Sequence, residues 1–152
     1  KVAGMLKLKS LRDATHEHLN AIKTQLTEDE FQKALYIIEE NDRVLKAAKM
    51  IAENKILELG KLLFEAHHGA QFQFKISCTE LDFLVEEARQ NPNVIGARMM
   101  GGGFGGCTIN IVKKGELKHY AENVSKAYMK KFNKACSVYY INLSEGTHII
   151  NN

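Results

Sequence analysis

The stretch Gly101-Gly102-Gly103-Phe104-Gly105-Gly106 decides the fold of this chain, because it holds five of the eleven glycines and separates two short runs of strand-forming residues. The runs cover residues 94–99 and 107–112, and we expect two strands joined by this loop. A two-residue hairpin turn needs one or two residues at positive φ, whereas this loop has many positions free of the Cβ penalty. The sequence therefore predicts a wide loop whose backbone can approach a ligand, with a flexible hairpin or a contact with a partner domain as alternatives.

The loop also fits a phosphate-binding pattern. Successive backbone N–H groups in such a loop can form a concave anion site, and Gly101, Gly103 and Gly106 match G-x-G-x-x-G. In dinucleotide-binding folds this pattern opens a helix, but here it leads into the run 107–112. Protein kinases place such a loop between two strands, yet the chain has no V-A-I-K, H-R-D or D-F-G sequence and no Walker-type loop. A phosphate cradle would therefore belong to another class of kinase.

No acid or base accompanies the loop in the sequence. Residues 94–112 contain no Asp, Glu or His, and their ionisable side chains are Arg98 and Cys107. Phosphoryl transfer needs positioning, neutralisation of charge by metal and cations, and a residue that orients the nucleophile. We expect this chain to supply only the positioning, with no catalytic residue of its own. The candidate site is the loop together with its flank, Arg98, Met99 and Met100.

The region before the loop is predicted to be helical. Apolar residues recur at helical spacing over 31–52 and again over 56–66, where the second helix should stop near Gly69. A shorter helix is expected after Thr15. Ser77-Cys78-Thr79-Glu80 fits a capping box that starts a further helix, which should end before Pro92.

Beyond the second strand, the sequence predicts a helix over about 116–134 and a strand over 137–143. Helices mixed with antiparallel strands indicate an α+β fold in which helices pack on one face of the sheet. The length of 152 residues fits one domain.

Composition excludes several classes of protein. The chain is 45% hydrophobic and 26% charged, values typical of a folded globular domain, and it has no apolar run of about 18 residues, so we expect no membrane span. The net charge of +3 is too small to indicate nucleic-acid binding, and Lys126, Lys130 and Lys134 are expected to form a solvated helix face. Three cysteines without a Cys-x-x-Cys pair fit a reducing cytoplasm, and Cys78 is expected to be a small core residue.

Two groups of side chains could in principle hold a metal ion, and we expect neither to do so. The carboxylates of one group could pair with a neighbouring arginine or hold a metal, but they lie in a charged helix segment, where carboxylates are more often solvated. The histidine pairs lack a third ligand at a recognisable spacing. The residues considered are Glu39, Glu40 and Asp42 beside Arg43, and the pairs His16 with His18 and His67 with His68.

Residues 96–107 resemble the third, C-terminal motif of the GHMP sugar and metabolite kinases, and the wording G-G-G-F-G-G-C resembles that of galactokinases. Residues 36–45 and 76–82 also resemble galactokinase segments, and the resemblance extends from about Ser10 to Ile150. Two departures are visible. Met100 stands where many relatives have threonine, and Thr79 where many have proline.

The resemblance implies a ferredoxin-like α+β lobe, residues 1–152, with a helical N-terminal portion. It implies a parent enzyme that transfers the γ-phosphate of ATP, with Mg²⁺, to the anomeric hydroxyl of galactose, giving galactose 1-phosphate. The Gly101–Gly106 loop would face the reacting centre. The family's N-terminal lobe, which carries sugar, nucleotide, metal and base, has no counterpart in this sequence. We therefore expect the isolated chain to be inactive, with that lobe as its partner.

Other functions stay open at this point. A related kinase acting on N-acetylgalactosamine is possible because the residues that select the sugar lie mostly in the absent lobe. A sugar-sensing module without kinase chemistry would keep the same fold. DNA or RNA binding through the lysine helix is the weakest alternative. A lobe separated from its partner should also expose an apolar patch, which predicts self-association.

Overall fold

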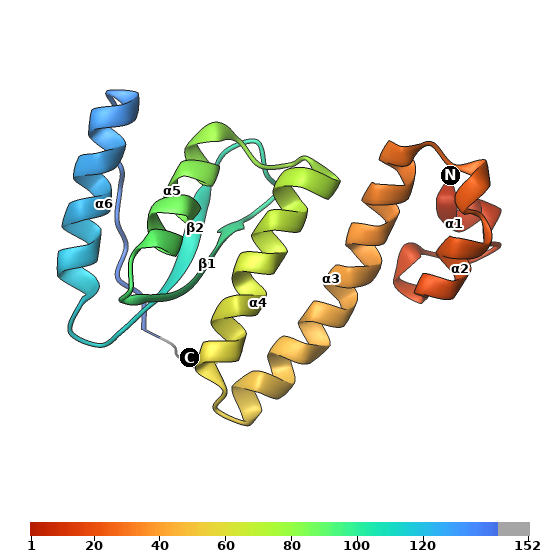
Figure 1. Ribbon diagram of the computed structural model, residues 1–152, viewed down its shortest axis with the longest axis horizontal. Coiled ribbons are helices and arrows are strands. Elements are labelled where there is room, and N and C mark those ends of the chain that lie inside the picture. Colours follow the sequence, from red (N-terminus) through yellow and green to blue (C-terminus); the bar gives the residue numbers. More distant parts are fainter. Residues whose placement is uncertain (143–152) are drawn as a thin grey trace, which may run out of the picture.

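The computed structural model describes residues 1–142 as a small helical unit joined by one long helix to a body of helices and a β-hairpin (Figure 1). The α-helices and strands are α1 Val2–Met5, α2 His16–Ala21, α3 Glu28–Ala52, α4 Ile56–His68, α5 Thr79–Gln90, β1 Val94–Met100, β2 Cys107–Val112 and α6 Leu117–Phe132. Short turns of 3-10 helix cover Leu11–Asp13 and Lys23–Gln25, and a π-helical turn covers Gly69–Phe74. Within the described residues, no helix is long and apolar enough to cross a membrane.

Helix α3 links the two parts of the molecule. It starts at a capping box in which the Thr27 side chain accepts from the Glu30 amide and the Glu30 side chain accepts from the Thr27 amide. Its first half contributes to the small N-terminal core, and its second half lies beside α4 (Figure 1). The predicted helices over 31–52 and after Thr15 are confirmed. The N-terminal core consists of Val2, Ala14, Leu19, Ile22, Phe31, Ala34 and Ile38.

The predicted helix over 56–66 and its stop near Gly69 are confirmed, since α4 ends at His68 with Gly69 as its C-cap. The chain continues as a π-helical turn to Phe74, and the left-handed residue that ends it is Lys75, with φ of 62°. Gly69 itself is right-handed helical. A Cβ there would lie 2.9 Å from the Tyr36 ring of α3, so this glycine also permits close packing against α3.

The prediction of a capping box at Ser77 is wrong. Helix α5 begins at Thr79, with Cys78 as its N-cap and no side-chain cap hydrogen bond. Ser77 therefore lies one residue too early to cap the helix, and its hydroxyl donates to Asp82 Oδ1 instead. The predicted end before Pro92 is confirmed, since α5 ends at Gln90.

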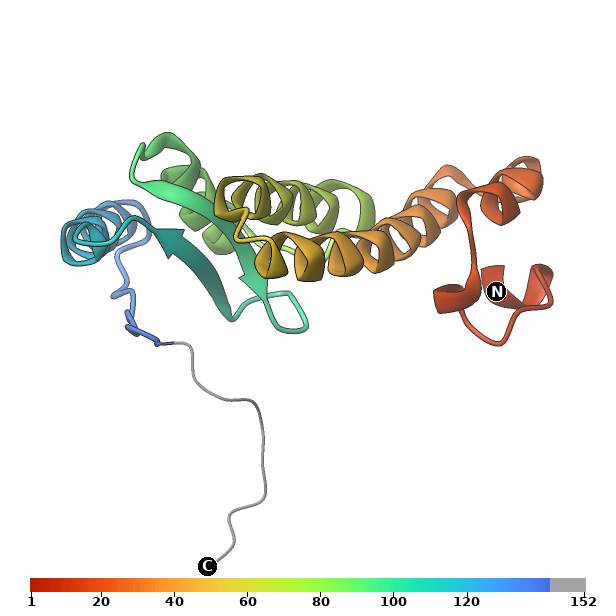
Figure 2. The ribbon, with the colours of Figure 1, turned by 90° about the horizontal axis from the view of Figure 1, so that it is seen from below.

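Strands β1 and β2 form an antiparallel hairpin, with Gly96 opposite Ile111 and Met100 opposite Cys107. Helices α4 and α5 lie on one side of this hairpin (Figure 2). Helix α4 crosses β1 so closely that a Cβ on Gly60 would lie 2.0 Å from the Ile95 carbonyl oxygen. The α+β architecture with helices packed on an antiparallel sheet is confirmed. The core beneath α5 and α6 consists of Val85, Ala88, Ala97, Tyr120 and Val124.

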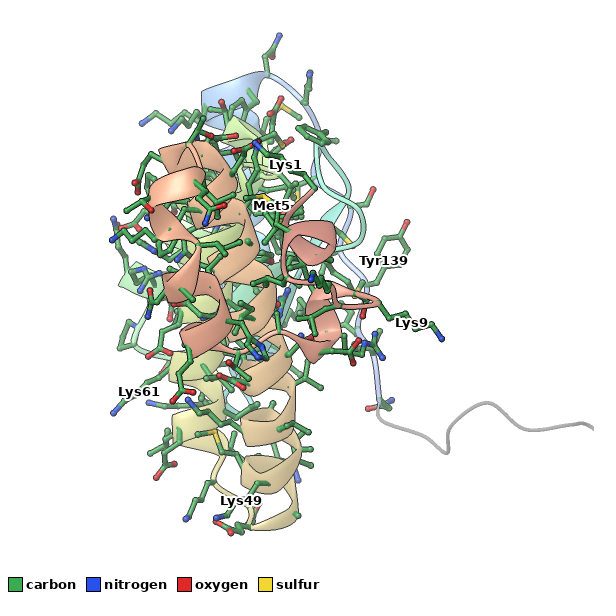
Figure 3. The ribbon with its side chains drawn as sticks, turned by 90° about the vertical axis from the view of Figure 1, so that its right-hand side faces the viewer. Lys1, Met5, Lys9, Lys49, Lys61 and Tyr139 are labelled. Atoms are coloured by element: carbon green, nitrogen blue, oxygen red, sulfur yellow. The ribbon has the colours of Figure 1, made fainter. Side chains whose placement is uncertain are left out.

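The strand predicted over 137–143 is not formed in the described part of it. Residues 137–142 make no ladder, and position 143 lies outside the described residues. The large apolar side chains of this run are exposed. Tyr139 is 81% exposed and projects away from the body (Figure 3). The alternation of the sequence was therefore not sufficient to make a strand. Helix α6 ends at Phe132, so Lys134 lies beyond it, 3.9 Å from Glu80.

Four large apolar side chains in the second half of α3 and the first turn of α4 are each at least 60% exposed. The uncovered apolar patch expected from the sequence and the self-association that it would favour stay predictions. The residues are Val44, Leu45 and Ile51 of α3 and Leu57 of α4.

Candidate functional site

The glycine loop connects β1 to β2, and its backbone requires glycine. Four of its glycines have positive φ, including 98° at Gly101 and 90° at Gly103. A Cβ on Gly103 would lie 2.3 Å from the Ile76 carbonyl oxygen, so this position is closed to any side chain. Phe104 adopts φ of 58°, which is uncommon for a bulky residue and marks a conformation fixed by its surroundings.

One hydrogen bond holds the loop against the body. The Phe104 amide donates to the Ile76 carbonyl oxygen at 2.7 Å. Among residues 1–142, no other amide of Gly101–Gly106 has a backbone or side-chain acceptor, and the Phe104 side chain is 77% exposed. Unpaired amides on left-handed glycines fit an anionic ligand such as phosphate.

Met99, the second-to-last residue of β1, is held on both of its backbone polar groups. The Met99 amide donates to His67 Nδ1 of α4 at 3.2 Å, and the Met99 carbonyl oxygen accepts from Arg98 Nε at 3.2 Å. The Met99 side chain is buried, in a cluster with Tyr36 and Leu81. Helices α3, α4 and α5 thus fix the entry to the loop.

Arg98 is itself held by a network of charges on α3. Its terminal nitrogen lies 3.1 Å from Glu40 Oε2, and Arg43 pairs with both Glu40 and Glu39. The side chains of Glu40 and Arg43 are 18% and 13% exposed. The expectation that these carboxylates are solvated is wrong for Glu40, which instead follows the alternative and pairs with Arg43.

His67 is the most buried polar side chain of the body, at 2% exposure. Its Nε2 lies 3.2 Å from Asp82 Oδ1, the oxygen that also accepts from the Ser77 hydroxyl. Burial lowers the pKa of His67 below its usual value, while the Asp82 carboxylate acts in the opposite direction. In the sequence, His67 stands out only as half of a histidine pair that could hold a metal, because Met99 and Asp82 are distant along the chain.

The other titratable candidates lie apart from the loop. His16 pairs with Asp42 at 3.4 Å on the surface, and His68 lies against Phe72. Cys78 is half-buried and packs against the core near Met99, as expected of a small core residue. Within the described residues, no three His, Cys, Asp or Glu side chains converge as a metal site would require.

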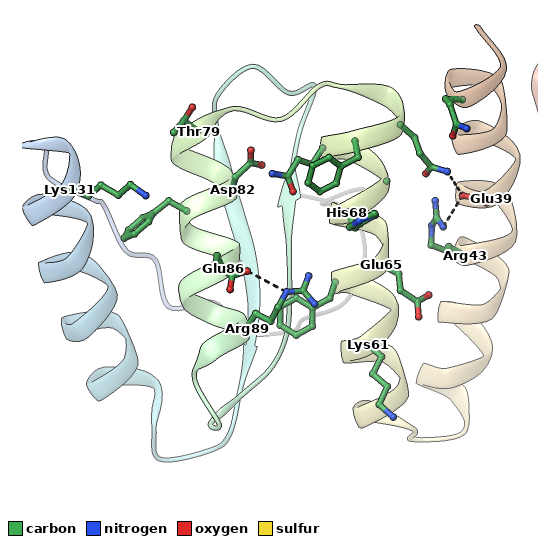
Figure 4. A pocket seen from close by; sticks show the side chains of 17 residues that line it. Glu39, Arg43, Lys61, Glu65, His68, Thr79, Asp82, Glu86, Arg89 and Lys131 are labelled. Atoms are coloured by element: carbon green, nitrogen blue, oxygen red, sulfur yellow. Dashed lines mark hydrogen bonds and ion pairs between the residues drawn. The ribbon is translucent and has the colours of Figure 1, made fainter. Parts of the chain in front are cut away.

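An open groove of about 1200 Å³ lies over α3, α4 and α5 (Figure 4). The glycine loop does not line it, and charges of both signs, including Arg89 and Glu86, lie along it. A smaller hollow of about 540 Å³ lies between β2, α6 and residues 135–142. Met100 and Gly106, the residues at the two ends of the loop, line that second hollow.

Comparison with known proteins identifies relatives for this arrangement. Residues 47–131 match the family model described as GHMP kinases C terminal. The chain is 36% identical to the galactokinase of Thermotoga maritima over 150 residues and 35% identical to that of Clostridium beijerinckii over 151 residues. Each match covers 99% of this chain but only 42% and 39% of the respective relative.

A solved structure agrees with these relatives. The galactokinase of Lactococcus lactis, crystallised in complex with galactose, superposes with a TM-score of 0.83 at 27% identity. The superposition covers 91% of this chain and 38% of that protein. The fold and the sequence therefore point to the same group of proteins.

Proposed function

This chain belongs to the GHMP kinase family as a C-terminal domain, and on that premise we propose that the full-length protein containing it is a galactokinase. Its reaction would move the γ-phosphate of ATP to the anomeric hydroxyl of galactose and yield galactose 1-phosphate and ADP. The identity to galactokinases along nearly the whole chain carries this proposal.

The Gly101–Gly106 loop would form one wall of the cleft in which phosphate is transferred. Its unpaired amides can donate to anionic oxygens without any side chain intervening. Among the described residues, only the Phe104 amide of the loop is bonded to the body. The other amides of the loop are therefore available to a bound ligand. The domain would position the reacting groups and add no acid or base.

Magnesium and the catalytic groups would come from the part of the protein that this chain does not contain. Among the described residues, no three His, Cys, Asp or Glu side chains converge, so this chain offers no all-protein cage for Mg²⁺. Mg²⁺ would supply neutralisation of phosphate charge. We therefore propose that the isolated domain is inactive and that an N-terminal lobe with nucleotide and sugar sites is its partner.

ADP release by the full-length protein tests this function, with the 152-residue chain assayed beside it. The substrates are galactose, N-acetylgalactosamine, mevalonate and homoserine. We expect turnover with galactose by the full-length protein and none by the chain alone. Turnover with another substrate would discard the choice of sugar, and no turnover by a folded full-length protein would favour a sugar-binding module instead.

A further inference from the structure

His67 is a buried titratable group for which the proposed reaction has no use. A buried imidazole costs free energy unless its nitrogens are paired. Here Nδ1 accepts a hydrogen bond from the Met99 amide, whereas the buried Nε2 lies 3.2 Å from Asp82 Oδ1 as an electrostatic contact without hydrogen-bond geometry. The first contact reaches Met99, near the end of β1 and two residues before the glycine loop, and the second reaches α5.

The contact with Met99 requires one particular form of the ring. Nδ1 accepts a hydrogen bond, so it carries no proton, and a neutral ring must then carry its proton on Nε2. The Asp82 carboxylate favours that tautomer because it lies 3.2 Å from Nε2. Ser77 donates to the same carboxylate oxygen and holds it in place.

The Met99 carbonyl oxygen is fixed by a second, separate chain of contacts. Arg98 Nε donates to it, and Glu40 on α3 lies 3.1 Å from the Arg98 guanidinium. Met99 is thus clamped from α3 and from α4, two residues before Gly101. A residue held this way sets the direction in which the loop leaves β1.

We propose that His67, oriented by Asp82, is a positioning residue that fixes the Gly101–Gly106 loop for phosphate transfer. This inference rests on the proposed kinase function. His67 touches no reacting group and acts only through the Met99 amide. Because catalytic geometry is sensitive to displacements of about 1 Å, a loosened loop lowers kcat by about tenfold or more.

The test uses the full-length protein and three matched variants. His67→Phe keeps a ring of similar size but removes the acceptor, whereas His67→Asn places an amide oxygen near the position of Nδ1. His68→Asn is the control, because His68 is the exposed neighbour and does not contact Met99. The measurements are kcat and KM for galactose and hydrogen exchange of peptides that contain residues 99–106.

We expect His67→Phe to lower kcat about tenfold or more with KM changed less than about threefold, and to speed hydrogen exchange in the loop. His67→Asn should restore kcat to within about threefold of the parent, and His68→Asn should match the parent. A folded His67→Phe with the parent's kcat, or one whose kcat falls without faster loop exchange, would overturn the proposal.

A pH profile gives a second test if His67→Phe does not fold. Protonation of Nδ1 removes the acceptor, so turnover of the parent should fall more between pH 6.5 and 5 than turnover of His67→Asn. The charged groups that face the ring are Asp82 and Arg89 of α5 and Arg98 of β1. Identical acid profiles for the two proteins would contradict the positioning role.

The two proposals fail in different ways. If the full-length protein turns over none of the four substrates, the kinase function is lost, but hydrogen exchange still reports whether His67 orders the loop. If turnover with galactose is present and His67→Phe leaves both kcat and loop exchange unchanged, the kinase function stands and the positioning role is lost.

Discussion

Two groups of glycines in this domain serve different physical purposes. At the crossing of α4 over β1, Gly60 and Gly96 bring two backbones together, and a Cβ on Gly96 would lie 2.4 Å from the Gly60 Cα. In the loop, a Cβ on Gly102 would meet nothing within 4 Å. The crossing glycines allow packing, whereas most loop glycines allow a backbone conformation and an open surface. The loop can therefore be altered without unfolding the domain, and the crossing cannot.

The largest effect should come from Gly60→Ala in the full-length protein. The added methyl group meets backbone atoms of β1, so the strand must move, and overpacking of this kind costs about 1–3 kcal/mol or more. Urea unfolding monitored by circular dichroism measures the loss.

Gly4→Ala is the matched control for this prediction. Gly4 also lies in a helix but has nothing within 4 Å of its Cβ position. Because alanine favours helices over glycine by about 1 kcal/mol, the control should be neutral or stabilising. Equal stability of both variants would show that the crossing is looser than the structure indicates.

Gly103→Val should have the next largest effect, and on turnover more than on stability. The valine meets the Ile76 carbonyl oxygen and cannot easily adopt φ of 90°, so the loop must leave its position. We expect turnover with galactose to fall about tenfold or more while α4 and α5 stay folded. Unchanged kinetics in this variant would count against any role of the loop.

Low pH should weaken the contact between His67 and Met99 and leave the packing of α4 on β1 unchanged. The folded pKa of His67 is below its ordinary value of 6.5, so the unfolded state takes up the proton first as the pH falls through 6.5. Stability is then lost at no more than about 1.4 kcal/mol per pH unit for this one group. Urea unfolding between pH 7 and pH 5 should show a smaller acid loss for His67→Asn than for the parent. Equal slopes would mean that His67 does not titrate differently on folding.

Gly102→Ala should have the smallest effect on stability. Its φ is not positive, and its Cβ would lie in open space. The free energy of unfolding, measured through the melting temperature, should therefore change by less than about 0.5 kcal/mol. Any fall in turnover would then report contact with a ligand or lobe outside residues 1–142. We expect a fall of about threefold or more, and unchanged turnover would place the reacting groups away from Gly102.

Much of the fold could be predicted because periodicity reports burial directly. The apolar spacing over residues 31–52 predicted α3, and the glycine-rich break between two strand-forming runs predicted the hairpin and its loop. These features depend on residues close together in sequence.

The errors arose where a residue's partner is distant or missing. Glu40 looked solvated because its helix neighbours are charged, but Arg98 reaches it from β1. His67 had no visible partner in the sequence because Met99 and Asp82 meet it only in the folded chain. The run 137–142 has strand-like residues, yet nothing in the described structure covers them.

The close crossing of α4 over β1 also limits how this sequence can evolve. A side chain added at Gly60 meets the backbone at Ile95, and one added at Gly96 meets the backbone at Gly60. Because the nearest obstacle at each position is a main-chain atom, no replacement of a neighbouring side chain can make room for it. No second mutation can therefore compensate for a side chain at either position. A mutational library should retain glycine at both sites, whatever other substitutions it carries.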